Sequence, residues 1–374
     1  MLNILHKNES KHPAIERVAR RERDMPDIIT SPADWRGAYI AQRSDWIHEF
    51  TPAEIAEIET ATRQALAAGK TLETLTKDDF PLPLVSQRLA HARSFLEEGL
   101  GIYQFRGIKV DGYDKSTLRL MYWGIGKHMG TAVSQSKDGD LLGDVRDVGV
   151  DVNSPQGRGY KSNQRLTFHT DTCDVVGLMV LRVAKQGGLS LLASSHAIHN
   201  HMACTRPDLL EVLYQPFTWS WQTQEPIGGV PHYQQPLFSM KDGKLSCRYV
   251  RVHITSGQRF AEVERLTPIQ IEALDAFDKL AWSEDFHFSF MFKPGDLQFV
   301  NNHVALHSRT AFEDYEETDR KRHLLRMWLS VPNSRPLSDA LSTIYQDRKG
   351  GEVRGGFPSR TGKYIYESTG ALSD

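Results

Sequence analysis

The 374-residue sequence predicts a mostly β fold with flanking helices, of the double-stranded β-helix (jelly-roll) type. From about residue 132 onward, short apolar segments alternate with turn signals and read as strands. Helical spacing is concentrated in the first 130 residues, with one clear helix later in the chain. Many short strands with few helices are typical of a double-sheet jelly roll.

The expected organisation is a polar N-terminal arm at residues 1–30 followed by a single domain at 31–374. That domain has a helical N-terminal part and a jelly-roll core at about 100–332. Its first helix begins after Thr51, because Pro52 suits the first turn and Glu54 completes a capping box with Thr51.

The remaining elements follow from apolar spacing and turn residues. Helices are expected at 84–98, 115–128 and 267–282, and Ser194 or Ser195 caps a short helix that carries His196 and His199. The predicted strands cover 102–105, 132–135, 145–152, 165–172, 175–183, 189–193, 217–222, 244–250, 287–291, 297–301 and 323–330.

Composition bounds the partners. A net charge of −2 gives no electrostatic reason to expect nucleic acid or a membrane surface as a partner. Three cysteines without paired spacing predict reduced thiols and a cytoplasmic location. No segment has the length of a membrane span or the apolar run of a secretory signal, and nothing indicates an oligomeric state.

One motif carries chemistry. His169 and Asp171 are two residues apart on a predicted strand, so both side chains leave the same face. With one distant histidine they would form the 2-His-1-carboxylate facial triad that holds Fe(II) and leaves open positions for a chelating co-substrate and O₂. His307 is the preferred third ligand and His303 is the alternative. The histidine run at 196–201 is a weaker metal candidate, because no carboxylate accompanies it.

Two arginines follow that histidine. Arg322 and Arg326 are separated by an even number of residues on a predicted strand, which puts both guanidinium groups on one face. Planar guanidinium groups suit bidentate binding of carboxylates. The two residues are therefore candidate carboxylate anchors.

An ordered set of motifs now resembles the taurine dioxygenase family of Fe(II)- and 2-oxoglutarate-dependent oxygenases (clavaminate synthase-like). The set is His-Thr-Asp at 169–171, Gly-Gly-x-Ser at 187–190, Pro-Gly-Asp at 294–296, the distal His307, and Arg-x-x-x-Arg at 322–326. The resemblance implies that His169, Asp171 and His307 bind iron.

The same resemblance implies that Arg322 and Ser190 hold the distal carboxylate of 2-oxoglutarate. It implies that Arg326 meets an acidic group of the substrate. The gap between His307 and Arg322 is longer than in taurine dioxygenase, which predicts a loop at 313–321 and leaves open which arginine does which task.

Other candidates have structural alternatives. Asn163 either donates to 2-oxoglutarate or is a turn residue. Trp219 and Trp221 either line the substrate pocket or belong to the core. Arg248 is assigned to the substrate, whereas Arg251 lies an odd number of residues away and faces the other side of the strand.

The resemblance implies a dioxygenase that uses Fe(II), 2-oxoglutarate as co-substrate and O₂ to hydroxylate or desaturate a small, carboxylate-bearing organic substrate. Asp171 favours these outcomes over halogenation, because related halogenases lack the carboxylate ligand. Two alternatives are a zinc metallohydrolase, which leaves Arg322 and Arg326 unexplained, and a jelly-roll binding protein without catalysis.

Overall fold

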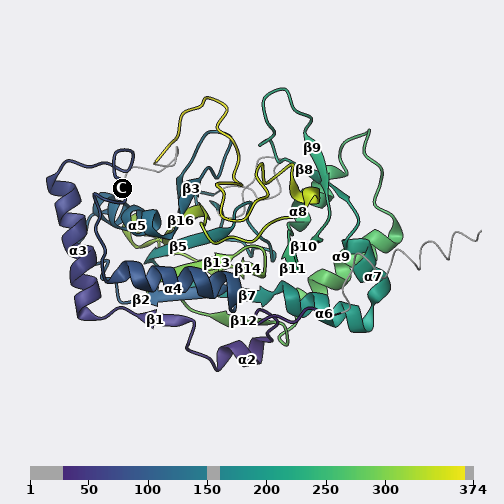
Figure 1. Cartoon of the computed structure of the whole chain (residues 1–374), viewed down its shortest axis with the longest axis horizontal. Helices are drawn as coiled ribbons and strands as arrows, with labels where there is room; N and C mark the ends of the chain where they lie inside the picture. Colours follow the sequence, from purple (N-terminus) through teal and green to yellow (C-terminus); the bar gives the residue numbers. More distant parts are fainter. Residues whose placement is uncertain (1–27, 150–160, 367–374) are drawn as a thin grey trace, which may run out of the picture.

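A computed structural model describes residues 28–149 and 161–366 (Figure 1). These residues form a sheet-rich fold with flanking helices, as the strand and helix pattern predicts. The predicted N-terminal arm at 1–30 lies almost entirely outside the described residues.

The larger sheet has seven strands in the order β1-β2-β13-β5-β16-β3, and β4 also pairs with β16. β1 and β2 are parallel, whereas the other neighbours are antiparallel. Its strands are β1 (Ile47–Glu49), β2 (Ile102–Arg106), β3 (Thr131–Val133), β4 (Leu142–Val145), β5 (Val175–Arg182), β13 (Leu297–Asn301) and β16 (His323–Ser330).

A smaller sheet has three antiparallel strands in the order β12-β7-β14. They are β12 (His287–Phe290), β7 (Ser190–Ser194) and β14 (Ala305–Arg309). Three further pairs complete the described strands: β6 (Gln186–Gly187) with β15 (Phe312–Glu313), β8 (Phe217–Ser220) with β9 (His232–Gln235), and β10 (Phe238–Lys241) with β11 (Lys244–Cys247).

Helices lie at both ends of the sheets, with α3, α4 and α5 towards the left of Figure 1 and α6, α7 and α9 towards the right. Thr51 and Glu54 form the predicted capping box at the start of α3. The α-helices are α2 (Gly37–Ala41), α3 (Pro52–Ala67), α4 (Val85–Glu98), α5 (Lys115–Met129), α6 (Ser195–Thr205), α7 (Pro207–Leu213), α8 (Arg251–Gly257) and α9 (Pro268–Ala281); η2 (Thr318–Arg320) and η3 (Asp339–Leu341) are 3₁₀ turns.

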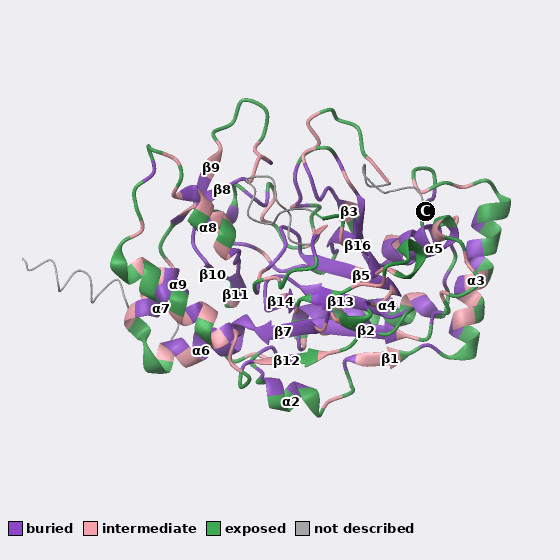
Figure 2. Cartoon of the chain, turned by 180° about the vertical axis from the view of Figure 1, so that it is seen from behind, coloured by how far each residue is buried: buried purple, intermediate pink, exposed green. Residues whose placement is uncertain are grey.

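The two faces of the larger sheet have different surroundings: one packs in the apolar core and the other lines a cavity. Along β16, Leu325, Met327 and Leu329 join the apolar core shared with α3, α4 and α5. The alternating residues Arg326 and Trp328 leave the opposite face, as the pleat requires, and line a cavity. Residues of the smaller sheet line the same cavity. Figure 2 shows that β5, β13 and β7 are largely buried.

Two predicted strands, 297–301 and 323–330, have the observed bounds. The strand predicted at 145–152 is observed instead as β4, which ends at Val145; residues 150–152 lie outside the described residues. An Asp147 carboxylate oxygen accepts a hydrogen bond from Gly149 N at 2.9 Å, and Gly149 has a φ of 73°. This turn, which only glycine adopts without strain, stops the extended backbone.

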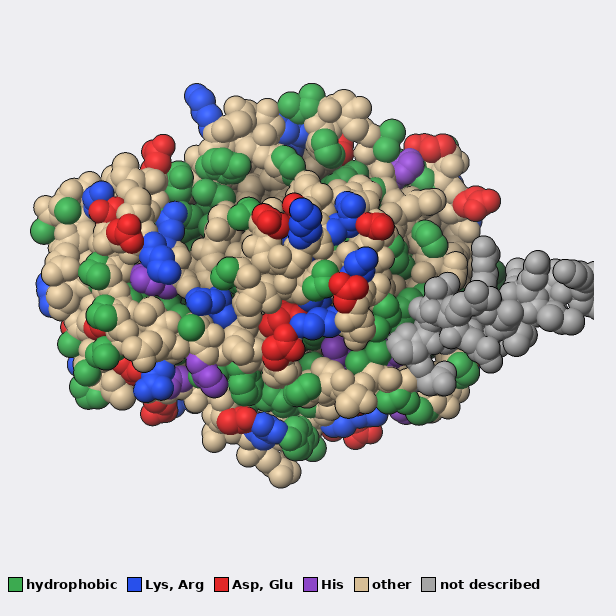
Figure 3. All heavy atoms as spheres, in the orientation of Figure 1, with side chains coloured by type: hydrophobic (Ala, Val, Ile, Leu, Met, Phe, Trp, Pro, Cys, Tyr) green, Lys and Arg blue, Asp and Glu red, His purple; other side chains and the backbone are tan. Residues whose placement is uncertain are grey.

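Surface charge agrees with the small net charge. Figure 3 shows acidic and basic side chains interspersed over the face seen in Figure 1. No helix within residues 28–149 or 161–366 has the length and apolarity needed to cross a membrane.

Candidate active site

The strand predicted at 165–172 is wrong, although the two side chains it was meant to align do converge. Within this span only His169 makes a β-bridge, one to Val250 and one to His307. His169 and His307 exchange both backbone hydrogen bonds at 3.0 Å, so their side chains leave the same face. The imidazole centroids are 4.3 Å apart. Pairing with β14, and not a strand period, places His169.

Asp171 is held by contacts from distant parts of the chain. Its backbone N donates to Asn302 Oδ1 at 2.8 Å, and Trp328 Nε1 donates to its Oδ2 at 2.9 Å. His307 Nε2 lies 3.6 Å and Arg326 Nη1 lies 3.8 Å from that same oxygen. Ligand atoms of His169, Asp171 and His307 all lie within 4.8 Å of one another. No other group of metal-ligating side chains of this kind occurs among the described residues.

The protonation states suit a cation. Burial, reinforced by His307, lowers the pKa of His169 to about 3, so this imidazole is neutral. His169 Nδ1 lies 2.8 Å from Thr167 O, to which it can only donate, and Nε2 is therefore the free lone pair. Burial alone would raise the pKa of Asp171, but Arg326 and His307 outweigh it and hold that pKa well below its usual range. Two imidazoles and one carboxylate on one side of a cavity fit the Fe(II) facial triad.

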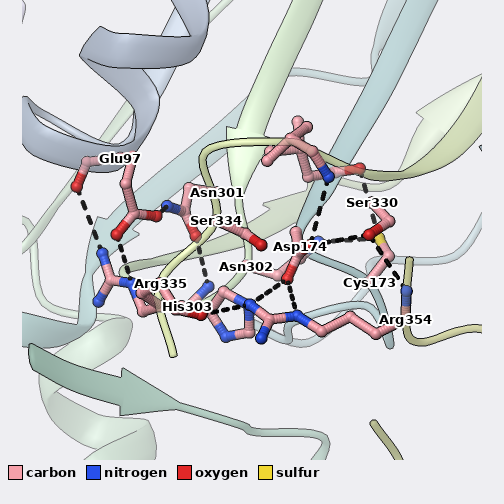
Figure 4. A network of polar contacts seen from close by, with 12 residues as sticks. Glu97, Cys173, Asp174, Asn301, Asn302, His303, Ser330, Ser334, Arg335 and Arg354 are labelled. Carbon is pink, nitrogen blue, oxygen red and sulfur yellow. Dashed lines mark hydrogen bonds and ion pairs between the residues drawn. The ribbon is translucent and has the colours of Figure 1, made fainter. Parts of the chain in front are cut away.

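His303, the alternative ligand, is engaged elsewhere. It is buried, and its Nε2 lies 2.9 Å from Asp174 Oδ1, within the polar network of Figure 4. The histidine run is likewise occupied in the helix α6 that Ser194 caps. His196 Nε2 contacts Leu245 O at 3.3 Å, and His199 Nε2 contacts Tyr214 Oη at 2.9 Å. Neither histidine belongs to a group of His, Cys, Asp or Glu side chains that could hold a metal.

A cavity of about 490 Å³ opens beside the triad. Ser190, Arg322 and Arg326 all line it, although Arg322 precedes β16 and only Arg326 lies on that strand. In the pairing of β16 with β5, the register shifts between His323 and Leu324, which lie between the two arginines in the sequence.

The two arginines have different surroundings. Arg322 Nη1 is buried without a hydrogen-bond partner among the described residues. Burial, with Arg309 second, lowers the pKa of Arg322 to about 9. Arg326 instead lies near Asp171, and its Nε donates to Gln135 Oε1 at 2.7 Å.

Three of the weaker candidates do not reach the cavity. Trp219 and Trp221 are buried against Tyr233 in the apolar core and are not among the cavity-lining residues, which favours their core alternative. Asn163 is exposed and lies outside the lining as well; its carbonyl accepts from Phe312 N at 3.0 Å. It is the turn residue of the two alternatives.

Arg248 does line the cavity, but its nitrogens serve the loop that carries Asp171. Nη1 donates to Thr170 O at 2.6 Å, and Nη2 donates to Thr172 Oγ1 at 2.9 Å. Arg251 is paired with Asp275 and Asp278 away from the site. Arg248 thus positions the loop that carries Asp171, a contact that sequence spacing does not reveal.

The family model described as "Taurine catabolism dioxygenase TauD, TfdA family" matches residues 66–328 of this chain. FR-33289 synthase from Streptomyces rubellomurinus is 34% identical over 324 residues, which cover 84% of this chain and 94% of that protein. The taurine hydroxylase-like protein SAT17 from Stachybotrys chartarum is 32% identical over 303 residues, covering 78% and 77% of the two chains.

Solved structures show the same fold. Asparagine oxygenase in complex with Fe(II), hydroxyasparagine and succinate has a TM-score of 0.60 at 18% identity, covering 76% of this chain and 93% of its own. The non-haem iron oxygenase OrfP in complex with Fe and alpha-ketoglutaric acid has a TM-score of 0.58 at 19% identity, covering 82% and 100%. The chain belongs to the TauD/TfdA family and is an Fe(II)- and 2-oxoglutarate-dependent dioxygenase, neither a zinc hydrolase nor a binding protein without catalysis.

Proposed function

We propose that His169, Asp171 and His307 hold Fe(II) in this dioxygenase, and that Arg322 and Ser190 hold the distal carboxylate of 2-oxoglutarate. The observation that carries this assignment is the convergence of three ligand atoms within 4.8 Å beside a cavity that both Arg322 and Ser190 line. Bound there, Fe(II) supplies the oxidation of a C–H bond by O₂ coupled to decarboxylation of 2-oxoglutarate.

The protein's own side chains orient the carboxylate of Asp171 and limit the access of water to the reacting carbon. Trp328 fixes one oxygen of Asp171, and Asn302 fixes its backbone, so the carboxylate keeps one direction. Val176 and Leu178 of β5 give the cavity an apolar wall, which limits water around the reacting carbon. The outcome is hydroxylation or desaturation of the substrate.

An anaerobic absorption spectrum tests the assignment. Fe(II) and 2-oxoglutarate added together to the metal-free protein should produce a weak visible charge-transfer band, which Zn²⁺ in place of Fe(II) cannot produce. The same band in an Asp171→Ala, His307→Ala double variant would show that the iron binds elsewhere.

Arg322→Ala is expected mainly to raise the KM for 2-oxoglutarate. It removes a charge-assisted contact worth roughly 1.5–3 kcal/mol, which corresponds to an increase of about ten- to hundredfold. Steady-state kinetics with varied 2-oxoglutarate measure the change. If Arg326→Ala shows this increase while Arg322→Ala leaves the KM as in the wild type, the two roles are exchanged.

We further propose that the substrate is a small molecule with a carboxylate or similar anionic group, such as an amino acid or related organic acid. Arg326 supports this, because it lines the cavity next to Asp171 and makes no ion pair with Glu313 or Asp314. Solved relatives of this fold include complexes with hydroxyasparagine and with (3S)-hydroxy-L-Arg.

Arg326→Ala should remove most of the affinity for such a substrate, by about tenfold or more, because a charged hydrogen-bonded pair is lost. The KM for 2-oxoglutarate should change far less. Since Arg326 also lies near Asp171, the charge-transfer band of this variant serves as the control for an intact iron site. Equal turnover of a substrate and its methyl ester by the wild-type enzyme would contradict the proposal, since the ester has no charge there.

We also propose that the two facing sheets form a jelly roll with its core at about 100–332, within a single domain at 31–374. The family match at 66–328 and the cavity between the sheets support this organisation. A cytoplasmic location is proposed as well, supported by the three free cysteines.

A further inference from the structure

Arg309 belongs to none of the family motifs described above, and it has no role in the proposed Fe(II) and 2-oxoglutarate sites. It ends β14 two residues after His307, so the two side chains leave the same face of the strand. Arg309 is also directly opposite Ser190 in the β7–β14 pairing, and residues opposite one another share a face. His307, Arg309 and Ser190 accordingly all line the cavity.

The nitrogens of Arg309 are only partly satisfied. Nε donates to Thr310 O at 3.1 Å and Nη2 donates to Gln164 O, and both contacts fix the plane of the guanidinium. Nη1 is buried without a partner among the described residues, as is Nη1 of Arg322. The residues Arg309 and Arg322 are 4% and 6% exposed, so water does not readily replace a missing acceptor.

Both guanidinium groups lie near one aromatic ring. Their central carbons are 4.5 Å and 5.2 Å from the centroid of the same Phe312 ring. Neither group forms an ion pair with a carboxylate of the described residues; Asp147 acts on Arg309, and Asp314 acts on both groups, only at longer range. Burial lowers the pKa of Arg309 to about 10, and Arg309 in turn helps to lower that of Arg322.

Two buried cations, each with an Nη1 that has no acceptor, are unfavourable without a nearby anion. A carboxylate accepts several hydrogen bonds and carries the compensating charge. Ser190 lines the same cavity opposite Arg309 in the strand pairing, so its hydroxyl is a third candidate donor.

We propose that Arg309 is a second arginine of the 2-oxoglutarate site, its Nη1 donating to the distal carboxylate beside Arg322 and Ser190. The inference rests on the proposed placement of that carboxylate. It predicts that the site distinguishes 2-oxoglutarate from 2-oxo acids without a distal carboxylate through two guanidinium groups.

The test is an anaerobic titration of the Fe(II)-loaded protein, followed by the charge-transfer band. The probes are 2-oxoglutarate and 2-oxopentanoate, which keeps the chelating end but has a methyl group in place of the distal carboxylate. Arg309→Gln should raise the Kd for 2-oxoglutarate tenfold or more and change the Kd for 2-oxopentanoate less than twofold. Arg320→Gln is the matched control, because Arg320 is exposed on the neighbouring loop and pairs with Glu317; both Kd values should stay unchanged.

Arg309→Lys keeps a positive charge but loses the direction of Nη1, and it should raise the 2-oxoglutarate Kd severalfold. If Arg309→Gln does not fold, as judged by circular dichroism, the lysine variant decides, and an unchanged ratio of the two Kd values overturns the inference. Equal weakening of both probes also overturns it, since that marks a structural role.

Arg322→Gln separates the inference from its premise. An increase in the 2-oxoglutarate Kd for Arg322→Gln but not for Arg309→Gln overturns the inference alone. No increase for either variant overturns the placement of the co-substrate itself.

Discussion

Asp171→Ala and His307→Ala are each expected to reduce 2-oxoglutarate turnover to the level of the metal-free protein. Each change leaves two ligands, which cannot fix the geometry of the iron. Asp171→Ala also removes the carboxylate that lies 3.8 Å from Arg326, so an uncompensated guanidinium would face the incoming cation. Succinate formation with saturating Fe(II) and 2-oxoglutarate measures the loss.

His303→Gln provides the matched control for His307→Ala. His303 is four residues away and buried against Asp174, so its replacement should lower stability and leave the charge-transfer band in place at a permissive temperature. Full activity in His307→Ala together with loss of the band in His303→Gln would show that the wrong histidine has been assigned to the metal.

The sequence predicts the reactive groups better than it predicts how they are held. His169, Asp171 and His307 were identifiable because iron requires these donor types, and their motifs occur in a fixed order along the chain. The backbone reason was wrong, because His169 is placed by hydrogen bonds to His307 and not by a strand of its own. Residue chemistry is local, whereas pairing across more than a hundred residues is not.

Arg309 could have been found by the rule already applied to Arg322 and Arg326. It follows His307 by an even number of residues, so both side chains share a face once the strand Ala305–Arg309 is recognised. That strand was not predicted. The strand β10 was missed in the same way, although the strand after it was predicted at 244–250 and Asp242-Gly243, both at positive φ, is a strong turn signal between the two. In contrast, no spacing indicates that Arg248 would support the loop carrying Asp171, because that contact depends on the completed fold.

Arg354→Ala is expected to lower the free energy of unfolding by about 3–5 kcal/mol, the effect of removing one partner from a buried ion pair. Arg354 is fully buried, and its Nε donates to Asp174 Oδ1 at 2.9 Å. The variant leaves the buried Asp174 carboxylate without its cation, although His303 and Ser330 still contact it (Figure 4). Urea unfolding followed by circular dichroism measures the change.

Arg348→Ala is the matched control, because Arg348 lies in the same C-terminal segment and pairs with Asp339 at 2.6 Å on the surface. An exposed pair contributes about 1 kcal/mol or less, so this variant should unfold close to the wild type. Equal midpoints for the two variants would mean that other groups compensate the charge of Asp174.

Asp174 follows Asp171 by three residues, and Asn302 contacts both Asp171 N and Cys173 Sγ between them. The network that joins residue 354 to residue 174 therefore supports the loop that carries Asp171. This explains why a C-terminal arginine outside the cavity should matter for the stability of that loop.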